Sequence, residues 1–243
     1  KADKPFFCWH NSTRMHVWTH LSEKYKGKSG YGMYADGMME LDDGVGALLD
    51  KLDELGIADE TAVFLTSDNG GLSTSEGHPT SNLPLRAGKG WMYEGGIREP
   101  TIARVPGVTK AGSVCENYIT STDYFPTILD LLGLEYDGAK NLDGAIFTKL
   151  LAGEDYDRGP VFWHYPHYGN QGGAPSAAVR DGDWKLIEWY EDDSVELFNL
   201  RDDISEQKNL AAEQPERTAA MRAKLANWRE EVGAKMPSKR AVE

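Results

Sequence analysis

Apolar positions between residues 33 and 55 recur every three or four positions, which is the spacing of one helix face. They are Met38, Leu41, Val45, Leu48, Leu49, Leu52 and Leu55. Gly56 follows as a typical helix stop, so the pattern predicts a helix over 33–55. Two more helices are predicted, over 123–132 and, as an amphipathic and charge-rich segment, over 215–232.

Short apolar runs bounded by turn-forming residues predict strands over 6–10, 62–66 and 101–105. The first two runs are continuous, which is typical of strands buried on both faces. A helix followed by such a strand favours an α/β unit with a parallel sheet. Farther along, residues 177–190 and 195–200 predict antiparallel strands separated by the polar turn 191–193.

The predicted elements change in kind along the chain, with no internal repeat or low-complexity linker between them. We therefore expect an α/β body over residues 1–155 and a smaller α+β lobe over 156–243. The antiparallel strands and the last helix belong to the lobe. In an α/β sheet, ligands bind beyond the carboxyl ends of the strands, which points to the residues that follow 62–66.

Charge and cysteine content narrow the classes of function. The 243 residues carry 26 Lys and Arg against 39 Asp and Glu, a net charge of −13, which argues against nucleic acid or an anionic membrane as the main partner. No apolar run reaches the roughly 18 residues of a membrane span. Cys8 and Cys115 fit no zinc or disulfide pattern, and we expect both to be buried.

Asp68 and Asn69 directly follow the predicted strand 62–66 and precede two glycines. A carboxylate and an amide oxygen presented together suit a hard cation such as Ca²⁺ or Mg²⁺. The segment Ser-Asp-Asn-Gly is also excellent turn chemistry, since Asp and Asn hydrogen-bond to their own backbone. These residues alone leave both a metal site and a plain turn open.

Other candidates are cationic or imidazole groups in loops. Lys89 lies between two glycines, which let an anion approach the backbone closely. Histidines gather after the first predicted strand, among them His16. His164 and His167 lie in an aromatic segment suited to stacking on a ring and hydrogen-bonding its hydroxyls. A solvated lysine, and histidines that merely pack, are the alternatives.

Four short segments stand out when they are taken together and in order. They are residues 4–9, 13–16, 65–70 and, the most specific, Gly-Lys-Gly-Trp-Met-Tyr-Glu-Gly-Gly-Ile-Arg-Glu-Pro at 88–100. Together they resemble the arylsulfatase family, and weaker similarity continues through residues 121–127, 142–144, 180–186 and 196–200. The resemblance implies an α/β fold with an alkaline-phosphatase-like sandwich body and a smaller C-terminal α+β lobe that carries an antiparallel sheet. The chain is similar to the C-terminal half of that fold.

The resemblance also implies roles for individual residues. The family hydrolyses sulfate esters and binds one Ca²⁺, and Asp68 and Asn69 match two of the metal ligands. Lys89 matches a lysine that contacts the sulfate oxygens, and His16 matches a histidine that contacts sulfate and protonates the leaving group. Both are therefore expected to be catalytic and substrate-binding residues, with a sulfate ester as the substrate.

The family's nucleophile has no counterpart at either cysteine. The family makes it by oxidising a Cys or Ser to formylglycine within a C/S-x-P/A-x-R motif, and neither Cys8 nor Cys115 lies in such a motif. The aspartate pair that supplies the other metal ligands is also unmatched. We therefore do not expect this chain to encode formylglycine, and we expect an N-terminal half of the fold, or a second chain, to complete the active site.

Two alternatives to a sulfuric ester hydrolase stay open. A phosphodiester or phosphonate monoester hydrolase of the same superfold would also place a tetrahedral anion beside a metal, and a non-catalytic fragment lacking the nucleophile would bind or pack without turnover. If the substrate is a sulfated carbohydrate, we expect His164 and His167 to bind its sugar. Similarity to bacterial members of the family would imply a periplasmic or secreted protein.

Overall fold

The computed structural model describes residues 4–16, 20–73, 80–136, 138 and 142–238. The chain consists of two compact units, Lys1–Ala62 and Val63–Glu243. The expected division near residue 155 lies within the second unit and stays a prediction. None of the helices in the described ranges is both long enough and apolar enough to cross a membrane.

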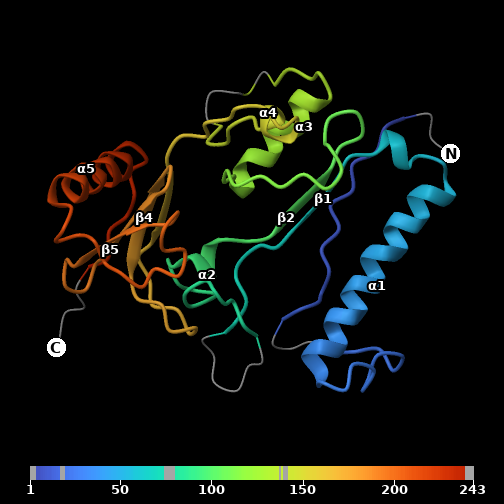
Figure 1. Cartoon of the computed structure of the whole chain (residues 1–243), viewed down its shortest axis with the longest axis horizontal. Coiled ribbons are helices and arrows are strands. Elements are labelled where there is room, and N and C mark those ends of the chain that lie inside the picture. The colour runs from blue at the N-terminus through green and yellow to red at the C-terminus, as the bar shows by residue number, and fades with distance from the viewer. Residues whose placement is uncertain (1–3, 17–19, 74–79, 137, 139–141, 239–243) are drawn as a thin grey trace. The chain divides into compact units, whose positions relative to one another are not determined.

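The first unit is built on one long helix, α1 (Met33–Glu54), which confirms the helix predicted over 33–55 (Figure 1). The buried Asp36 fixes the turn before it, because its carboxylate accepts hydrogen bonds from the backbone N–H groups of Gly27 and Ser29, both at 2.7 Å. A short 3-10 helix, η1 (Ala58–Glu60), follows α1.

The strand predicted over 6–10 is wrong. These residues are irregular, and the side chains of Phe6, Phe7 and Trp9 are 61%, 69% and 74% exposed. A strand needs a partner for its backbone hydrogen bonds, and the described part of the first unit contains no other strand. Cys8 is also exposed, as is Cys115 in the second unit, so the expectation that both cysteines are buried is wrong.

The second unit begins with a two-stranded antiparallel sheet of β1 (Val63–Thr66) and β2 (Thr101–Arg104). The strands predicted over 62–66 and 101–105 are confirmed. The expectation that the first of them is fully buried in a parallel sheet is wrong. Leu65 is 38% and Ile102 is 65% exposed, because two strands alone leave much of their surface uncovered by the described elements.

Three short helices follow, η2 (Ser121–Asp123), α3 (Tyr124–Leu131) and α4 (Thr148–Leu151). α3 confirms the helix predicted over 123–132. Phe64 of β1 meets Tyr124 and Phe147 edge to face, with ring centroids 5.6 and 6.4 Å apart. These aromatic contacts attach the two-stranded sheet to the helices.

A four-stranded antiparallel sheet in the order β3-β4-β5-β6 lies toward the C-terminus. Its strands are β3 (Val161–Tyr165), β4 (Ser176–Asp181), β5 (Trp184–Trp189) and β6 (Val195–Asn199). The predicted antiparallel arrangement is confirmed, and the stretch 177–190 contains two strands joined near Gly182, whose φ of 60° suits a tight turn. β3 has no predicted counterpart, since its sequence does not alternate between apolar and polar residues.

One face of this sheet packs on α5 (Pro215–Glu231), which confirms the helix predicted over 215–232 (Figure 1). Leu186 and Leu197 of the sheet form an apolar cluster with Met221 and Leu225 of the helix. We call this the α5 face of the sheet.

The opposite face packs on the segment that leads into α2 (Glu94–Ile97). Here Ile187 and Phe198 of the sheet cluster with Met92 and Tyr93. The faces differ because neighbouring residues on a strand point to opposite sides. We call this the α2 face; it supports the segment that begins at Lys89.

Candidate functional site

Backbone hydrogen bonds join the strand end after β1 to α2 and to the loop before it, residues 86–93, which contains Lys89. We call residues 86–93 the Lys89 loop. The Gly70 N–H donates to the Gly96 carbonyl at 3.2 Å, and the Lys89 N–H donates to the Gly71 carbonyl at 3.1 Å. A Cβ at Gly70 would lie 1.8 Å from a carbonyl oxygen of α2, so this approach requires glycine. The structure therefore brings Gly70 and Gly71, which directly follow Asp68 and Asn69, against α2 and the Lys89 loop.

The side chain of Asn82 reinforces this junction. Its Nδ2 donates to the carbonyls of Gly71 at 2.8 Å and Ala87 at 2.9 Å, so one amide group holds both segments. The Ser73 hydroxyl donates to the same Ala87 carbonyl at 2.8 Å. Neither Asn82 nor Ser73 belongs to a motif that would mark it in the sequence, and their roles appear only in the structure.

Glu99 is a third residue that the motifs do not single out as functional. One of its carboxylate oxygens, Oε1, is buried and has no hydrogen-bond partner among the described residues. Burial, and then the negative charge of the exposed Asp68, raise the pKa of Glu99 to about 7. Ionisation of Glu99 is therefore disfavoured beside Asp68, and a cation bound at the strand end would favour it.

The donor types at this strand end fit the expected Ca²⁺. Asp68 and Asn69 offer the oxygen ligands that a hard cation prefers, and the Glu99 oxygen that lacks a partner among the described residues is a further acceptor near Asp68. Within the described ranges, however, no group of three or more His, Cys, Asp or Glu residues is arranged to hold a metal ion. Asp68 and Asn69 thus fit as part of a ligand set.

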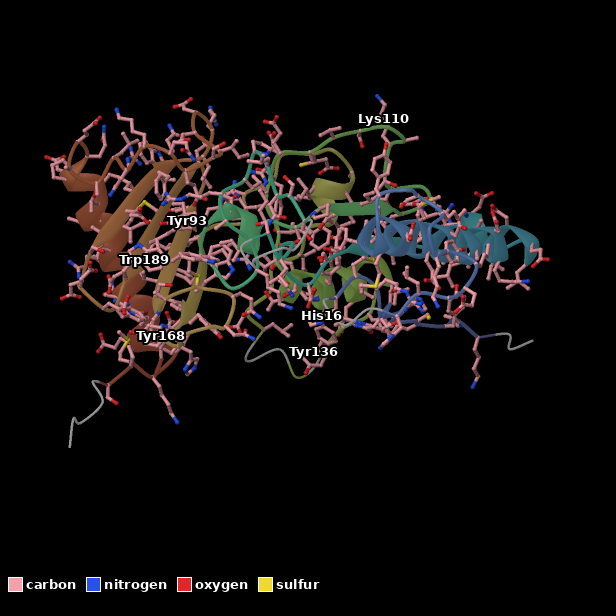
Figure 2. The ribbon with its side chains drawn as sticks, turned by 90° about the horizontal axis from the view of Figure 1, so that it is seen from below. His16, Tyr93, Lys110, Tyr136, Tyr168 and Trp189 are labelled. Atoms are coloured by element: carbon pink, nitrogen blue, oxygen red, sulfur yellow. The ribbon has the colours of Figure 1, made fainter. Side chains whose placement is uncertain are left out.

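Aromatic residues attach the segment after Lys89 to the α2 face. The rings of Tyr93 and Trp189 lie 5.7 Å apart between centroids, and both side chains donate to one carboxylate oxygen of Glu196, at 2.6 and 2.9 Å (Figure 2). Burial, followed by the hydrogen bond to Glu196, raises the pKa of the Tyr93 hydroxyl. The hydroxyl therefore remains a donor at neutral pH, and the segment is held by defined contacts.

The first unit contains the other expected catalytic residue, His16, whose side chain is exposed. Arg14, two positions before it, is paired with Glu40 of α1 at 3.0 Å. The hydrogen bond from Arg14 lowers the pKa of Glu40. These contacts attach the segment before His16 to α1, and a meeting of His16 with Lys89 at one substrate stays a prediction.

The two histidines of the expected sugar site differ in their surroundings. Both ring nitrogens of His164 have partners, since Nδ1 lies 2.7 Å from the Tyr190 hydroxyl and Nε2 lies 2.9 Å from the Lys235 carbonyl. His167 is exposed and meets Tyr165 edge to face at 5.4 Å between centroids. The role of both in substrate binding stays a prediction, and His167 is the better exposed of the two.

The loop 169–173 connects this aromatic segment to the surroundings of Lys89. The Trp91 indole N–H donates to the Gln171 carbonyl at 3.1 Å. A Cβ added at Gly173 would lie 1.8 Å from the Gly90 carbonyl oxygen, so the two backbones are in close contact. The loop therefore lies beside the residue that follows Lys89.

One segment matches the letters of the formylglycine motif. Residues 176–180 are Ser-Ala-Ala-Val-Arg, which fits the pattern S-x-A-x-R. Ser176 is 2% exposed at the start of β4, and its hydroxyl donates to the Ala174 carbonyl at 2.9 Å. A buried strand residue with an occupied hydroxyl does not present a nucleophile to a substrate, so the match does not change the expectation that formylglycine is not formed here.

Two family profiles match the chain. The profile described as Sulfatase matches residues 1–134, and the profile described as N-sulphoglucosamine sulphohydrolase, C-terminal, matches residues 87–232. Together they include Asp68, Asn69 and the Lys89 loop.

Curated relatives agree with these profiles. The chain is 35% identical to a sulfatase of Formosa agariphila over 88% of its length, and 35% identical to the N-acetylgalactosamine-6-sulfatase of Mus musculus over 85%. It is 34% identical to human arylsulfatase A over 76% of its length. These matches cover 43%, 39% and 36% of the three relatives, so the chain spans less than half the length of each.

Solved structures are similar in fold. The PsFucS1 sulfatase from Pseudoalteromonas sp. matches 88% of this chain with a TM-score of 0.70 and 27% identity, over 46% of its own chain. BT4656, solved in complex with its substrate D-glucosamine-2-N,6-O-disulfate, matches 86% with a TM-score of 0.68 and 25% identity, over 42% of its own chain. Profiles, relatives and folds thus agree that the chain belongs to the sulfatase family and has an alkaline-phosphatase-like fold.

Proposed function

We propose that the protein carrying this chain is a sulfuric ester hydrolase in which Lys89 binds the sulfate group. The observation that carries the proposal is the contact between the Lys89 loop and the residues that directly follow Asp68 and Asn69. The 3.1 Å hydrogen bond from the Lys89 N–H to the Gly71 carbonyl fixes this contact. A strand end that offers oxygen ligands to a cation, next to a lysine, is an arrangement suited to a tetrahedral anion. Membership of the sulfatase family supports sulfate as that anion.

Hydrolysis moves negative charge onto the oxygen that leaves sulfur. In the proposed mechanism, the Lys89 ammonium attracts the sulfate oxygens and stabilises the charge that develops in the transition state. His16, as an imidazolium, donates a proton to the leaving oxygen. The nucleophile comes from elsewhere in the protein, since neither Cys8 nor Cys115 lies in a formylglycine motif.

Asp68 and Asn69 are proposed to hold part of the coordination sphere of one Ca²⁺. When bound, such an ion would attract the sulfate oxygens and withdraw charge from sulfur. Calcium titration followed by calorimetry tests this for the intact protein, with Asp68→Asn as the variant and the exposed Asp193→Asn as its control. Calcium binding should weaken in Asp68→Asn alone, and equal binding in both variants would exclude Asp68 as a ligand.

The proposed substrate class is a sulfated carbohydrate. BT4656 is described with a sulfated glucosamine, and Ps i-CgsB, with a TM-score of 0.75 and 25% identity to this chain, is described in complex with k-i-k-neocarrahexaose. In this chain the loop 169–173 supplies amide groups beside the residues that follow Lys89. The exposed His167 supplies an imidazole two positions before this loop. Replacement of His167 by Ala should reduce turnover of a carbohydrate sulfate more than that of a small aryl sulfate, and equal losses would contradict the assignment.

The reaction class is tested by comparing turnover of nitrophenyl sulfate and bis-nitrophenyl phosphate by the intact protein. We expect kcat/KM to favour the sulfate ester by at least about tenfold. Preference for the phosphate would identify the phosphodiester hydrolase instead. Turnover of neither ester would support a non-catalytic binding role.

A further inference from the structure

A buried lysine on the α2 face lies between two buried glutamates. The Nζ of Lys185 is 2.9 Å from one oxygen of Glu94 and 2.9 Å from one oxygen of Glu206. All three side chains are at most 1% exposed. Burial of three charges costs solvation free energy that their mutual attraction repays only in a well-defined geometry. The cluster is therefore better explained by the segments that it holds in place than by a gain in net stability.

Glu206 contacts the chain on both sides of Lys89. Before the lysine, Nη1 of Arg86 donates to the Glu206 carbonyl at 2.8 Å. After it, the backbone N–H of Glu94 donates to the second carboxylate oxygen of Glu206 at 2.6 Å. Both ends of the segment that contains Lys89 are therefore hydrogen-bonded to one residue of the C-terminal lobe, Glu206.

Glu94 extends these contacts into the sheet. Its other carboxylate oxygen lies 3.5 Å from Arg180 of β4 and 3.6 Å from Arg98. α2 itself has four residues, too few for a helix that is stable alone. Its place, and with it the end of the Lys89 loop, depends on the ion pairs with the sheet.

We propose that Glu206 and Lys185 are positioning residues that clamp the base of the Lys89 loop and thereby set the place of the Lys89 ammonium. The benefit to sulfate binding rests on the proposed function, whereas the clamp itself does not. The Glu206 backbone has a φ of 51°, a left-handed conformation that residues other than glycine seldom adopt, and such strain concentrates where position matters.

Glu188 of β5 supplies a matched control. Like Glu206 it is a buried glutamate, with 4% of its surface exposed. Its carboxylate is paired with Arg229 of α5 at 2.9 Å. It lies on the α5 face, away from α2, because it is an odd number of positions from Lys185 along the strand. Glu206→Gln and Glu188→Gln each remove one buried carboxylate charge, the first from the clamp and the second from the opposite face.

Hydrogen exchange at the Lys89 amide, measured by NMR relative to the Leu186 amide, separates positioning from stability. Leu186 is fully buried in β5, so its exchange reports opening of the lobe. We expect Glu206→Gln to speed exchange of Lys89 relative to Leu186 by at least about tenfold. Glu188→Gln should not raise this ratio. The same ratio in both variants and in the wild type would overturn the clamp.

A second variant covers the case in which Glu206→Gln does not fold. Arg86→Met removes the hydrogen bond to the Glu206 carbonyl and leaves the buried charges in place, at a side chain that is 37% exposed. It should raise the Lys89 exchange ratio in the same direction. An unchanged ratio in this variant would overturn the clamp.

Turnover of nitrophenyl sulfate by the intact protein distinguishes failure of the clamp from failure of the proposed function. The clamp predicts a lower kcat in Glu206→Gln and a wild-type kcat in Glu188→Gln, because a misplaced Lys89 loses contacts made in the transition state. Faster Lys89 exchange in a protein that has no sulfatase activity even as wild type would support the clamp and overturn the proposed function.

Discussion

The two faces of the four-stranded sheet are packed by different kinds of interaction. On the α5 face, Leu186 and Leu197 pack on Leu225, and all three are fully buried among apolar neighbours. On the α2 face, an equally buried Lys185 is paired with Glu94 and Glu206. Apolar packing is non-directional and supplies stability, whereas ion pairs at hydrogen-bond distance fix direction and place. The α5 face stabilises the lobe, and the α2 face positions a loop.

The largest effect is expected from Lys185→Met on the α2 face. Without the ammonium, Glu94 and Glu206 face each other as buried carboxylates, which should cost about 3–5 kcal/mol in the free energy of unfolding. Denaturation in urea measures the loss. Adding Glu206→Gln should restore part of it, because one of the two charges is then removed. A loss below about 1 kcal/mol would show that the face does not depend on the ion pairs.

Leu225→Ala on the α5 face should cost about 3 kcal/mol, since it opens a cavity in the apolar cluster. The same urea titration measures it. Unlike Glu206→Gln, this variant should not raise the exchange of the Lys89 amide relative to that of Leu186, because a loosened apolar cluster speeds exchange at Leu186 itself. A rise in that ratio would show that the two faces are coupled.

Acid should weaken the α2 face through Glu94. Burial opposes ionisation of Glu94, but Lys185, Arg180 and Arg98 outweigh it and hold its pKa below the ordinary 4.5. A carboxyl whose pKa is lower in the folded state stabilises the fold above the unfolded value, and this contribution is lost as the pH falls through the folded value. Unfolding free energy should therefore decline below pH 4.5 more steeply in the wild type than in Glu94→Gln.

Glu206 should show the opposite sign. Burial raises its pKa and outweighs the attraction of Lys185. A carboxyl whose pKa is higher in the folded state adds stability as the pH falls through the folded value toward the unfolded 4.5. Glu206→Gln should lose this gain, so its profile should differ from that of the wild type above pH 4.5. Parallel pH profiles for the wild type and both Gln variants would contradict these assignments.

The smallest effect is expected at Glu99. One of its oxygens is buried near Asp68 and has no hydrogen-bond partner in the described part of the chain. Glu99→Gln should therefore raise stability in a chelating buffer, by less than about 1 kcal/mol because the side chain is only partly buried. Thermal unfolding with EDTA measures the change. A lower midpoint in Glu99→Gln would show that the carboxylate has a stabilising partner.

The sequence predicts elements whose pattern is local. The apolar period of α1 continues from residue 33 to 55, which is about six helical turns at roughly 3.6 residues a turn. It can be recognised without knowing the neighbours or ligands of the helix. Residues 6–10 and β1 have the composition of buried strands, but burial depends on what covers them. In the structure, Phe7 is 69% and Leu65 is 38% exposed, which no local pattern records.

The candidate site divides in the same way. Lys89 and residues 68–69 are found from glycine-rich motifs and the family resemblance, because the residues that indicate their chemistry are adjacent in the sequence. Glu206 is not, since it meets the Glu94 N–H across 112 positions of the chain. Asn82 and Glu99 likewise act through contacts that the fold creates. Positioning residues of this kind need a structure to be recognised.

The role of Lys89 in sulfate hydrolysis is tested most directly by Lys89→Ala in the intact protein, with the exposed Lys110→Ala as the control (Figure 2). Both variants remove one lysine from the second unit, and kcat/KM for nitrophenyl sulfate is the measurement. We predict a fall of about 100-fold or more for Lys89→Ala, as expected when a group that stabilises transition-state charge is removed, and no change for Lys110→Ala. Equal activity in the two variants would contradict the assignment of Lys89 as the sulfate-binding residue.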